Sequence, residues 1–200
     1  MSSTSSVDED TKELNNMFIK IQDLIPIQQE VNRKVSQKLN KTIEADEFIL
    51  AFNVELFEYF NAIGTWKWWK HSHQISKSKV LDELADCFAF FLSAIDVENE
   101  ISLLREEVEV ISKIEEQLNE VYENLLVNLK DKSFDREDVI NDLILYIGTD
   151  NEIEGITTVE RFAIAIFIAT LLFDEITWDA LTEAYKEKSK VNIQRQDENY

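Results

Sequence analysis

Glycine, proline and cysteine are scarce in this chain of 200 residues, which contains three glycines, one proline and one cysteine. Folds built from many short strands need glycine and proline at their turns, so this scarcity argues against such folds and favours long helices. The single cysteine, Cys87, excludes a disulfide framework within the chain and indicates a reducing compartment. Cys87 falls inside a predicted buried helix, where we expect a core thiol rather than a nucleophile.

Positive charge is also scarce, because 20 lysines and arginines face 40 acidic residues and leave a formal net charge of −20. Such a protein repels nucleic-acid phosphates and anionic lipid headgroups, so we expect direct binding to neither nucleic acid nor membrane. The most apolar run, residues 162–173, is too short to span a bilayer. The polar and acidic first ten residues lack the pattern of a signal peptide, so we expect a cytoplasmic protein.

Several common catalytic motifs are absent as well: the chain has no glycine-rich phosphate loop, no CxxC, no HExxH and no supported Ser–His–Asp set. His71 and His73 form an HxH pattern in a basic connector. Surface positions are a commoner role for such a pair than zinc ligation, which stays the alternative.

Apolar residues recur at helical spacing along most of the chain, and no stretch alternates as a strand would. The spacing predicts helices over residues 11–39 (broken or kinked at Pro26), 46–62, 76–97, 101–130, 135–148, 158–173 and 177–196. Residues 158–173 are apolar almost all round, which is typical of a central core helix or half of a dimer interface. We therefore predict an all-α multi-helix bundle preceded by a disordered tail over residues 1–10.

Two acidic pairs stand out, Glu55 with Glu58 and Glu83 with Asp86. Residues three apart lie on one side of a helix, but the same spacing recurs elsewhere in this acidic sequence, so spacing alone is weak evidence. Helical phase separates the two pairs from the rest, because each lies on or beside an apolar stripe. Buried carboxylates need partners or a metal ion. Four carboxylates that converge from two antiparallel helices would form an oxygen-ligand site suited to Mg²⁺.

Aromatic, basic and amide side chains accompany these acids. An aromatic and basic segment, 66–70, connects the two acidic helices, and further lysines and an arginine crowd residues 186–195. A polyphosphate needs such cations, although lysines near a helix C-terminus also simply favour the helix dipole. Gln28, Gln29 and Asn32 lie on one predicted helix, where they could bind a ligand's hydrogen-bonding edge or remain solvated.

Together these segments resemble the dimeric all-α dUTPase family, whose wider kin are the MazG-type nucleotide pyrophosphohydrolases. The resemblance spans roughly residues 25–100 and 160–197. It rests on ExxE at 55–58, W-K-W-W-K at 66–70, ExxD at 83–86 and Y-K-x-K-x-x-x-N-x-x-R-Q at 185–196. It implies Mg²⁺-dependent hydrolysis of dUTP to dUMP and pyrophosphate, with dUDP often also accepted.

The resemblance also assigns roles by position. The metal ligands of two or more Mg²⁺ ions would be Glu55, Glu58, Glu83 and Asp86, and Glu55 or Glu58 would orient or deprotonate the water that attacks the β-phosphorus. The nucleoside would contact Gln28 or Gln29, Asn32, Trp66, Trp69 and Asn192. The phosphates would contact Lys67, Lys70, Lys186, Lys190 and Arg195. Lys188 competes with Lys190 for one role, because KSKVNIQRQ departs from the more compact K-N-x-x-N-x-x-R of the family.

The same resemblance implies a homodimer whose sites draw on both subunits, with residues 158–173 at the interface. It divides the chain into a catalytic helical core (11–100 and 156–197), an acidic helical insert (101–155) and a frayed end (198–200). The insert resembles the variable region of staphylococcal phage members of the family, which also bind the repressor of a mobile pathogenicity island. A phage-encoded member would act in the host cytoplasm.

Two alternative functions stay open. One is a MazG-like pyrophosphohydrolase that acts on other nucleotides, such as dCTP, and a panel of nucleotides would distinguish it. The other is a non-enzymatic helical interaction protein whose acidic arm, residues 101–130, binds a basic partner. Mg²⁺-dependent turnover that is lost on Glu55→Ala substitution would exclude the second alternative.

Overall fold

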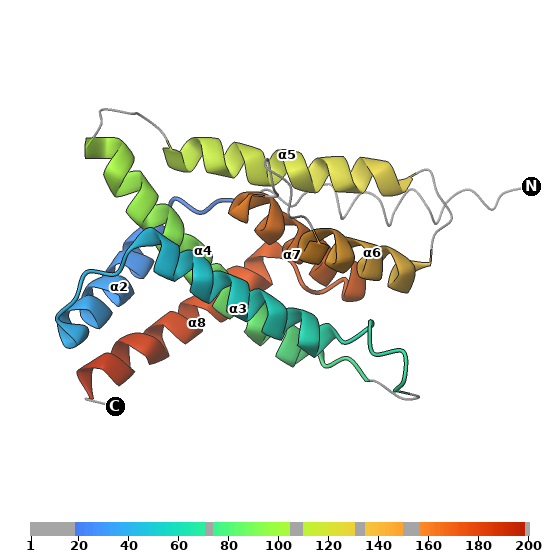
Figure 1. Cartoon of the computed structure of the whole chain (residues 1–200), viewed down its shortest axis with the longest axis horizontal. Coiled ribbons are helices and arrows are strands. Elements are labelled where there is room, and N and C mark those ends of the chain that lie inside the picture. The colour runs from blue at the N-terminus through green and yellow to red at the C-terminus, as the bar shows by residue number, and fades with distance from the viewer. Residues whose placement is uncertain (1–18, 71–73, 105–109, 131–134, 150–156, 199–200) are drawn as a thin grey trace, which may run out of the picture.

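The computed structural model describes residues 19–70, 74–104, 110–130, 135–149 and 157–198, and over these residues it is helical with no strand (Figure 1). The helices within these ranges are α2 (Ile25–Leu39), α3 (Ala45–Ile63), α4 (Lys77–Leu104), α5 (Val110–Lys130), α6 (Arg136–Thr149), α7 (Thr158–Leu172) and α8 (Trp178–Asp197). The predicted all-α fold is confirmed.

Short-range sequence signals set several helix ends. Thr157 and Glu160 form a capping box at the start of α7: the Thr157 hydroxyl accepts from the Glu160 N–H at 3.2 Å, and the Glu160 carboxylate accepts from the Thr157 N–H at 2.8 Å. Helix α3 ends at Gly64, whose φ of 63° lies in the left-handed region that glycine adopts without a steric penalty.

The predicted start of the first helix is wrong over the described residues. Residues 19–24 are not helical, and α2 begins at Ile25. Pro26 therefore lies in the first turn, where its missing N–H leaves no helical hydrogen bond unmade, instead of breaking a longer helix. Helix α4 also continues to Leu104, beyond its predicted end near residue 97. Residues 1–18, including the predicted tail, lie outside the described part of the chain.

The segment before α2 packs against α5 through its apolar residues, while the polar residues between them are exposed. Ile19 and Ile21 are fully buried. Their backbone N–H groups donate to the side chains of Asn119 (2.9 Å) and Glu115 (2.6 Å) on α5. These side-chain acceptors replace the helical carbonyls that would otherwise satisfy the buried N–H groups.

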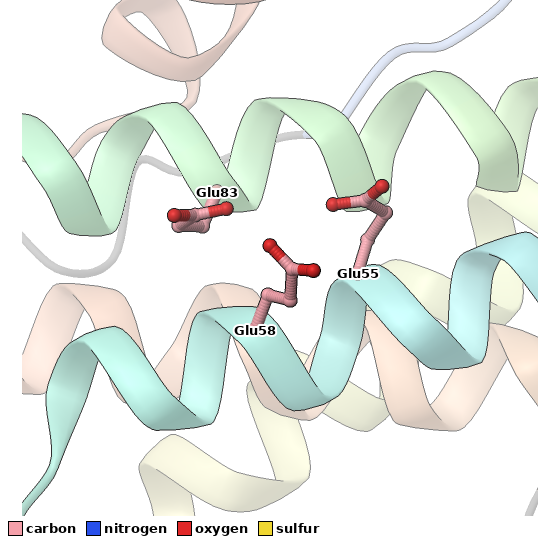
Figure 2. Close-up of side chains that lie close together, drawn as sticks. All are labelled: Glu55, Glu58 and Glu83. Carbon is pink, nitrogen blue, oxygen red and sulfur yellow. The ribbon is translucent and has the colours of Figure 1, made fainter.

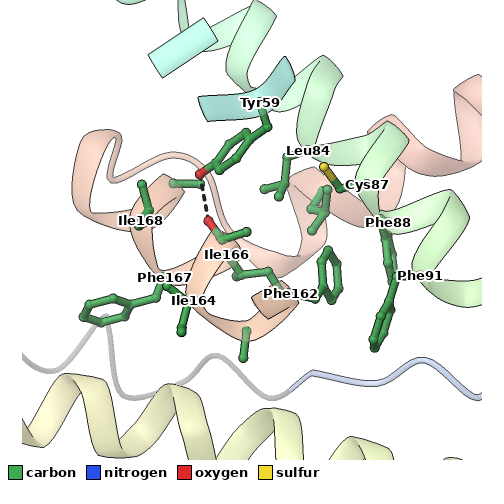
Figure 3. Close-up of a cluster of buried hydrophobic side chains, with 14 of the residues drawn as sticks. Tyr59, Leu84, Cys87, Phe88, Phe91, Phe162, Ile164, Ile166, Phe167 and Ile168 are labelled. Carbon is green, nitrogen blue, oxygen red and sulfur yellow. Dashed lines mark hydrogen bonds between the residues drawn. The ribbon is translucent and has the colours of Figure 1, made fainter. Parts of the chain in front are cut away.

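Helix α7 forms the centre of the core (Figure 3). Every side chain from Phe162 to Ala169 is buried, and the Phe162 ring stacks on Phe91 and Phe88 of α4, with centroids 4.4 and 5.1 Å away. The Tyr59 hydroxyl of α3 donates to the Ala165 carbonyl at 2.7 Å. Because a single chain already buries α7, its predicted place at a dimer interface is wrong, and the alternative of a core helix is confirmed.

The arrangement of α3, α4 and α8 determines where functional side chains can meet. Helices α3 and α4 run side by side in opposite directions, joined by the tryptophan-containing connector (Figure 1). Helix α8 crosses α4 and lies beside α2. Acidic residues of α3 and α4 and basic residues of α8 can therefore reach a common region.

Helices α5 and α6 contribute to the same hydrophobic core as the rest. Leu118 and Tyr122 of α5 and Ile140 and Ile147 of α6 are buried in it. The expected division into a catalytic core and an acidic insert stays a prediction. Among the helices described, none combines the length and apolar character needed to cross a bilayer.

Candidate active site

Three carboxylates converge between α3 and α4. Figure 2 shows Glu55 and Glu58 of α3 pointing toward Glu83 of α4. One oxygen from each carboxylate lies within 4.8 Å of the other two. The helical phase explains this convergence, since neighbours of the acids such as Tyr59 and Cys87 are buried in the core. The structure thus brings together three of the four predicted metal ligands.

The site carries more negative charge than its surroundings can easily solvate. Burial, together with the charges of Asp86, Glu58 and Glu83, raises the pKa of Glu55 to about 7. Burial also raises the pKa of Glu83 and that of Asp86. Ionised carboxylates in this position are therefore destabilised in the absence of a cation, and a bound cation would relieve that destabilisation.

The fourth predicted ligand, Asp86, does not join the group of three and is paired with Lys188 of α8 instead. The Lys188 ammonium donates to Asp86 Oδ2, to Asp82 Oδ1 at 2.9 Å and to the Asp82 carbonyl at 2.9 Å. Burial lowers the pKa of Lys188, but the hydrogen bonds to Asp82 and Asp86 outweigh it and leave that pKa raised. Of the two competing lysines, Lys188 reaches the acids, and Lys190 is exposed.

Two charged residues near this site were missed in the sequence. Asp82 lies four residues before Asp86, so it shares a helix side with that predicted ligand, which is a usable signal. Lys79 lies four residues before Glu83, and its ammonium lies 3.9 Å from a Glu83 oxygen. Both residues extend the charged region toward the N-terminal end of α4.

A cluster of amide side chains on α2 contacts α4 at Ser93, farther along α4 than the carboxylates. Gln28 is only 4% exposed; its Nε2 donates to Asn32 Oδ1 (3.0 Å) and Ser93 Oγ (2.8 Å), and its Oε1 accepts from the Tyr185 hydroxyl (3.0 Å). Ser93 follows Asp86 by two helical turns and so lies on the same face of α4, about 10 Å along the axis. The amide cluster therefore lies along α4 from Asp86.

Other members of the amide cluster differ in the hydrogen bonds that they make. Gln29 Nε2 donates to Asp96 Oδ1 at 2.7 Å. Asp96 is buried, which raises its pKa, and it was not predicted as a functional residue. The Asn32 Nδ2 group is buried and makes no hydrogen bond of ordinary length and angle. The Asn32 amide nevertheless lies close enough to the Asp96 carboxylate to lower its pKa, against the larger effect of burial.

The connector after α3 presents aromatic rings at the surface. The Trp66 indole donates to the Phe60 carbonyl at 3.2 Å, and its ring meets Trp69 edge-on with centroids 5.4 Å apart. The Lys67 ammonium lies 5.2 Å from the Trp66 ring centroid, and Lys70 is exposed. His71 and His73, the alternative zinc pair, lie outside the described residues.

An open apolar groove of about 480 Å³ begins at this connector and continues to α6. Its lining residues come from α3, the connector and α6: Phe57, Phe60, Asn61, Trp66, Ile144, Leu145 and Gly148. None of the four predicted metal ligands lines it. The groove is therefore a feature distinct from the carboxylate site.

The remaining predicted residues lie on α8. Lys186 pairs with Glu183 at 3.2 Å, Asn192 is half-buried and Arg195 is exposed. Within the described part of the chain, Lys188 is the residue of this basic segment that contacts the site carboxylates. Contacts of the other cations with phosphate stay predictions.

Comparison with known proteins identifies the family. A family model described as dUTPase matches residues 20–200, nearly the whole chain. The chain therefore belongs to the all-α dUTPase family, and its activity is the hydrolysis of dUTP. A search of curated proteins found no match.

Proposed function

We propose that the protein hydrolyses dUTP, and also dUDP, with Mg²⁺ held by Glu55, Glu58, Glu83 and Asp86. The observation that supports this proposal is the convergence of three carboxylate oxygens within 4.8 Å of one another. Mg²⁺ prefers carboxylate oxygens at about 2.0–2.1 Å, so its neighbouring ligands lie about 3 Å apart. A small closure of these side chains would bring the three oxygens to the spacing that one Mg²⁺ ion needs, and the donor set fits the metal. The proposal of two or more ions rests on the family resemblance.

The chain's own residues would handle the proton and the substrate. Mg²⁺, when bound, lowers the pKa of bound water and offsets charge on phosphoryl oxygens. Glu55 or Glu58 orients the attacking water and accepts its proton. The water oxygen bonds to the β-phosphorus. The bond from that phosphorus to the oxygen bridging the α- and β-phosphates breaks, and this oxygen leaves with dUMP. Pyrophosphate retains the oxygen of the water.

The amide cluster is the proposed nucleoside site. Asn32 has a buried donor that makes no hydrogen bond of ordinary geometry, although it interacts with the Asp96 carboxylate, and Gln28 or Gln29 lies beside it on α2. A buried donor that is weakly bonded favours a base with a matching acceptor and disfavours bases without one. The other proposed contacts are Trp66, Trp69 and Asn192 for the nucleoside, and Lys67, Lys70, Lys186, Lys190 and Arg195 for the phosphates.

A nucleotide panel tests base selectivity. Pyrophosphate release is measured from dUTP, dCTP, dTTP and UTP at saturating Mg²⁺, and the proposal expects dUTP to be preferred. Equal rates on dCTP and dUTP would favour the alternative of a broader MazG-like pyrophosphohydrolase. Asn32→Ala should lower the preference for dUTP while leaving Mg²⁺ binding intact.

We also propose a homodimer formed through the outer face of α3. Leu50, Val54 and Phe57 are 66%, 50% and 57% exposed and lie at helical spacing along one side of this helix. They form an uncharged stripe on a chain whose net charge is −20, and they continue into the apolar groove at Phe57. Large exposed apolar patches mark interaction surfaces. Molar mass in solution tests this proposal.

Binding to a repressor of a mobile genetic island stays a prediction of the resemblance alone. A gel-shift experiment with the repressor and its operator tests it. The role predicts that adding this protein releases the operator, and undiminished DNA binding would contradict it.

A further inference from the structure

Lys188 holds an unusual position for a cation in a metal-binding region. Its ammonium group donates to Asp86 Oδ2 and also to the side chain and the carbonyl of Asp82. Asp86 is one of the four proposed metal ligands, and it is the one that stands apart from the converging group. An ammonium group thus satisfies a carboxylate oxygen that a metal ion would use.

The same side chain comes from a distant part of the chain. Lys188 lies on α8, between the buried residues Tyr185 and Ser189, so its helix is anchored against the core. Anchoring limits how far the lysine stem can withdraw by backbone movement, but four rotatable side-chain bonds allow the ammonium group to swing. The lysine can therefore leave Asp86 without unfolding of α8.

A divalent cation at the carboxylates and the Lys188 ammonium would repel each other. Like charges a few ångströms apart in a partly buried site repel each other strongly unless one of them moves away. In the absence of metal the Lys188 ammonium stabilises the site instead, because its positive charge offsets part of the mutual repulsion of the acids. The same lysine therefore favours the metal-free site and opposes metal binding.

We propose that Lys188 is an internal counter-ion of the metal-free site, which occupies Asp86 until Mg²⁺ replaces its ammonium group there. This inference rests on the proposed metal site. Exchange of one cation for another leaves Asp86 paired with a positive charge in both states. It also sets the Mg²⁺ affinity lower than the four carboxylates alone would give.

A different role for Lys188 predicts the opposite result. Residues behind a metal ligand often orient it, and their removal lowers metal affinity by about 10–100-fold. If Lys188 only oriented Asp86 for the metal, its loss would weaken Mg²⁺ binding. If Lys188 competes with the metal, its loss tightens Mg²⁺ binding. The sign of the change separates the two roles.

The experiment measures Mg²⁺ affinity by calorimetry on the full-length protein without nucleotide. Lys188→Met should tighten Mg²⁺ binding by about tenfold, because the competing charge is gone. Lys188→Arg, which keeps the charge, should bind Mg²⁺ much as the wild type does. Lys113→Met removes the same charge from an exposed position on α5 and should leave the affinity within about twofold. Unchanged or weaker binding in Lys188→Met would overturn the proposal.

Thermal unfolding adds a second readout for the same variants. Without metal, Lys188→Met should melt at a lower temperature than the wild type, because Asp86 has lost its partner. Saturating Mg²⁺ should remove or invert this difference. An equal loss of stability with and without Mg²⁺ would identify an ordinary ion pair and contradict the exchange.

A measurement on the wild-type protein covers the case in which Lys188→Met does not fold. Reductive methylation followed by mass spectrometry reports how readily each lysine ammonium is reached. Mg²⁺ should speed the methylation of Lys188 several-fold relative to a metal-free sample in chelator, with Lys113 as internal reference. Slower or unchanged methylation of Lys188 would overturn the proposal. No Mg²⁺ binding to the wild type at all would instead refute the metal site on which it rests.

Discussion

Glu55 is half-buried whereas Glu58 is exposed, so Glu55 lies closer to the buried face of α3. Its carboxylate faces Glu58 on the same helix, Glu83 on the next, and the charge of Asp86. Few carboxylates in so acidic a chain have this combination of burial and like-charged neighbours. Predictions about metal binding and pH therefore concern this residue first.

Glu55→Gln should lower dUTP turnover at saturating Mg²⁺ by about 100-fold or more, because it removes a proposed metal ligand and proton acceptor. Pyrophosphate release measures the rate. Glu120→Gln is the matched control: Glu120 begins an ExxE pair on α5 but is exposed, and its substitution should change the rate by less than twofold. Comparable losses in the two variants would contradict the assignment.

The raised pKa of Glu55 predicts a pH dependence of stability in metal-free protein. The folded-state pKa is about 7 and the ordinary value is 4.5, so between these pH values the folded protein holds a proton that the unfolded chain has released. This difference lowers the free energy of unfolding as pH rises through the window. Glu55→Gln should therefore melt increasingly above the wild type from pH 4.5 to 7 in chelator.

Melting curves at several pH values check this expectation. Mg²⁺ should reverse the order near pH 7–8, since the wild type then gains the binding free energy of the metal. A difference in melting temperature that stays constant across the pH range would show that the carboxylate of Glu55 is not the cause.

At the level of residues, helical phase was sufficient to predict that Glu55, Glu58 and Glu83 converge, because each helix positions its own acids. Asp82 and Lys188 could not be paired from the sequence, since their contact depends on how α8 crosses α4. The same holds for Asp96, which is buried by α2. Amphipathic patterns identify the buried side of a helix but do not say which helix covers it.

At the level of elements, a buried hydrogen bond helps to link α3 to the core helix α7, beside a part-buried one from Arg161 to Asn53. The Tyr59 hydroxyl donates to the Ala165 carbonyl at 2.7 Å, and both groups are buried. Tyr59→Phe should reduce the free energy of unfolding by about 1 kcal/mol, as expected for a buried hydrogen bond. Urea denaturation measures the change.

Tyr146→Phe provides the control for that substitution. Tyr146 is 53% exposed on α6, so removal of its hydroxyl should change the free energy of unfolding by less than about 0.5 kcal/mol. A Tyr59→Phe protein as stable as the wild type would mean that the hydroxyl does not join α3 to α7.

The existence of each helix was easier to predict than the residue at which it starts. Gly64 and the capping box at Thr157 mark ends that local sequence determines. The region before Pro26 misled the prediction, because apolar residues at helical spacing also suit an extended segment covered by α5. Local spacing cannot distinguish these two cases when the covering helix lies about 90 residues away in sequence.

At the level of the whole molecule, the scarcity of glycine and proline together with helical spacing predicted the all-α class, since three glycines and one proline leave little material for turns. The same composition could not show that α7 is buried within one chain. A helix that is apolar all round suits either a core or an interface, and the choice depends on whether α3, α4 and α5 surround it. The described structure packs α4 and α5 against α7, together with α6. Helix α3 contacts α7 through Tyr59 and Phe52.

The exposed stripe on α3 leads to a prediction about assembly. Phe57→Glu should convert a dimer into a single chain of 23.4 kDa, because it places charge in the proposed interface. Light scattering coupled to gel filtration measures the mass. Val127→Glu, at an equally exposed position on α5, should leave the dimer intact. A wild-type protein with the mass of one chain would contradict the proposal.

The most direct test of the central claim is pyrophosphate release from dUTP by the wild type and Glu83→Gln, measured over a range of Mg²⁺ concentrations. Glu83 provides the test because it is the member of the converging group that α4 contributes. The wild type should release no pyrophosphate in chelator and should reach full rate as Mg²⁺ is added, while Glu83→Gln should need much more Mg²⁺ and stay slower. Full activity in chelator, or the same Mg²⁺ dependence in both proteins, would contradict the carboxylate site between α3 and α4.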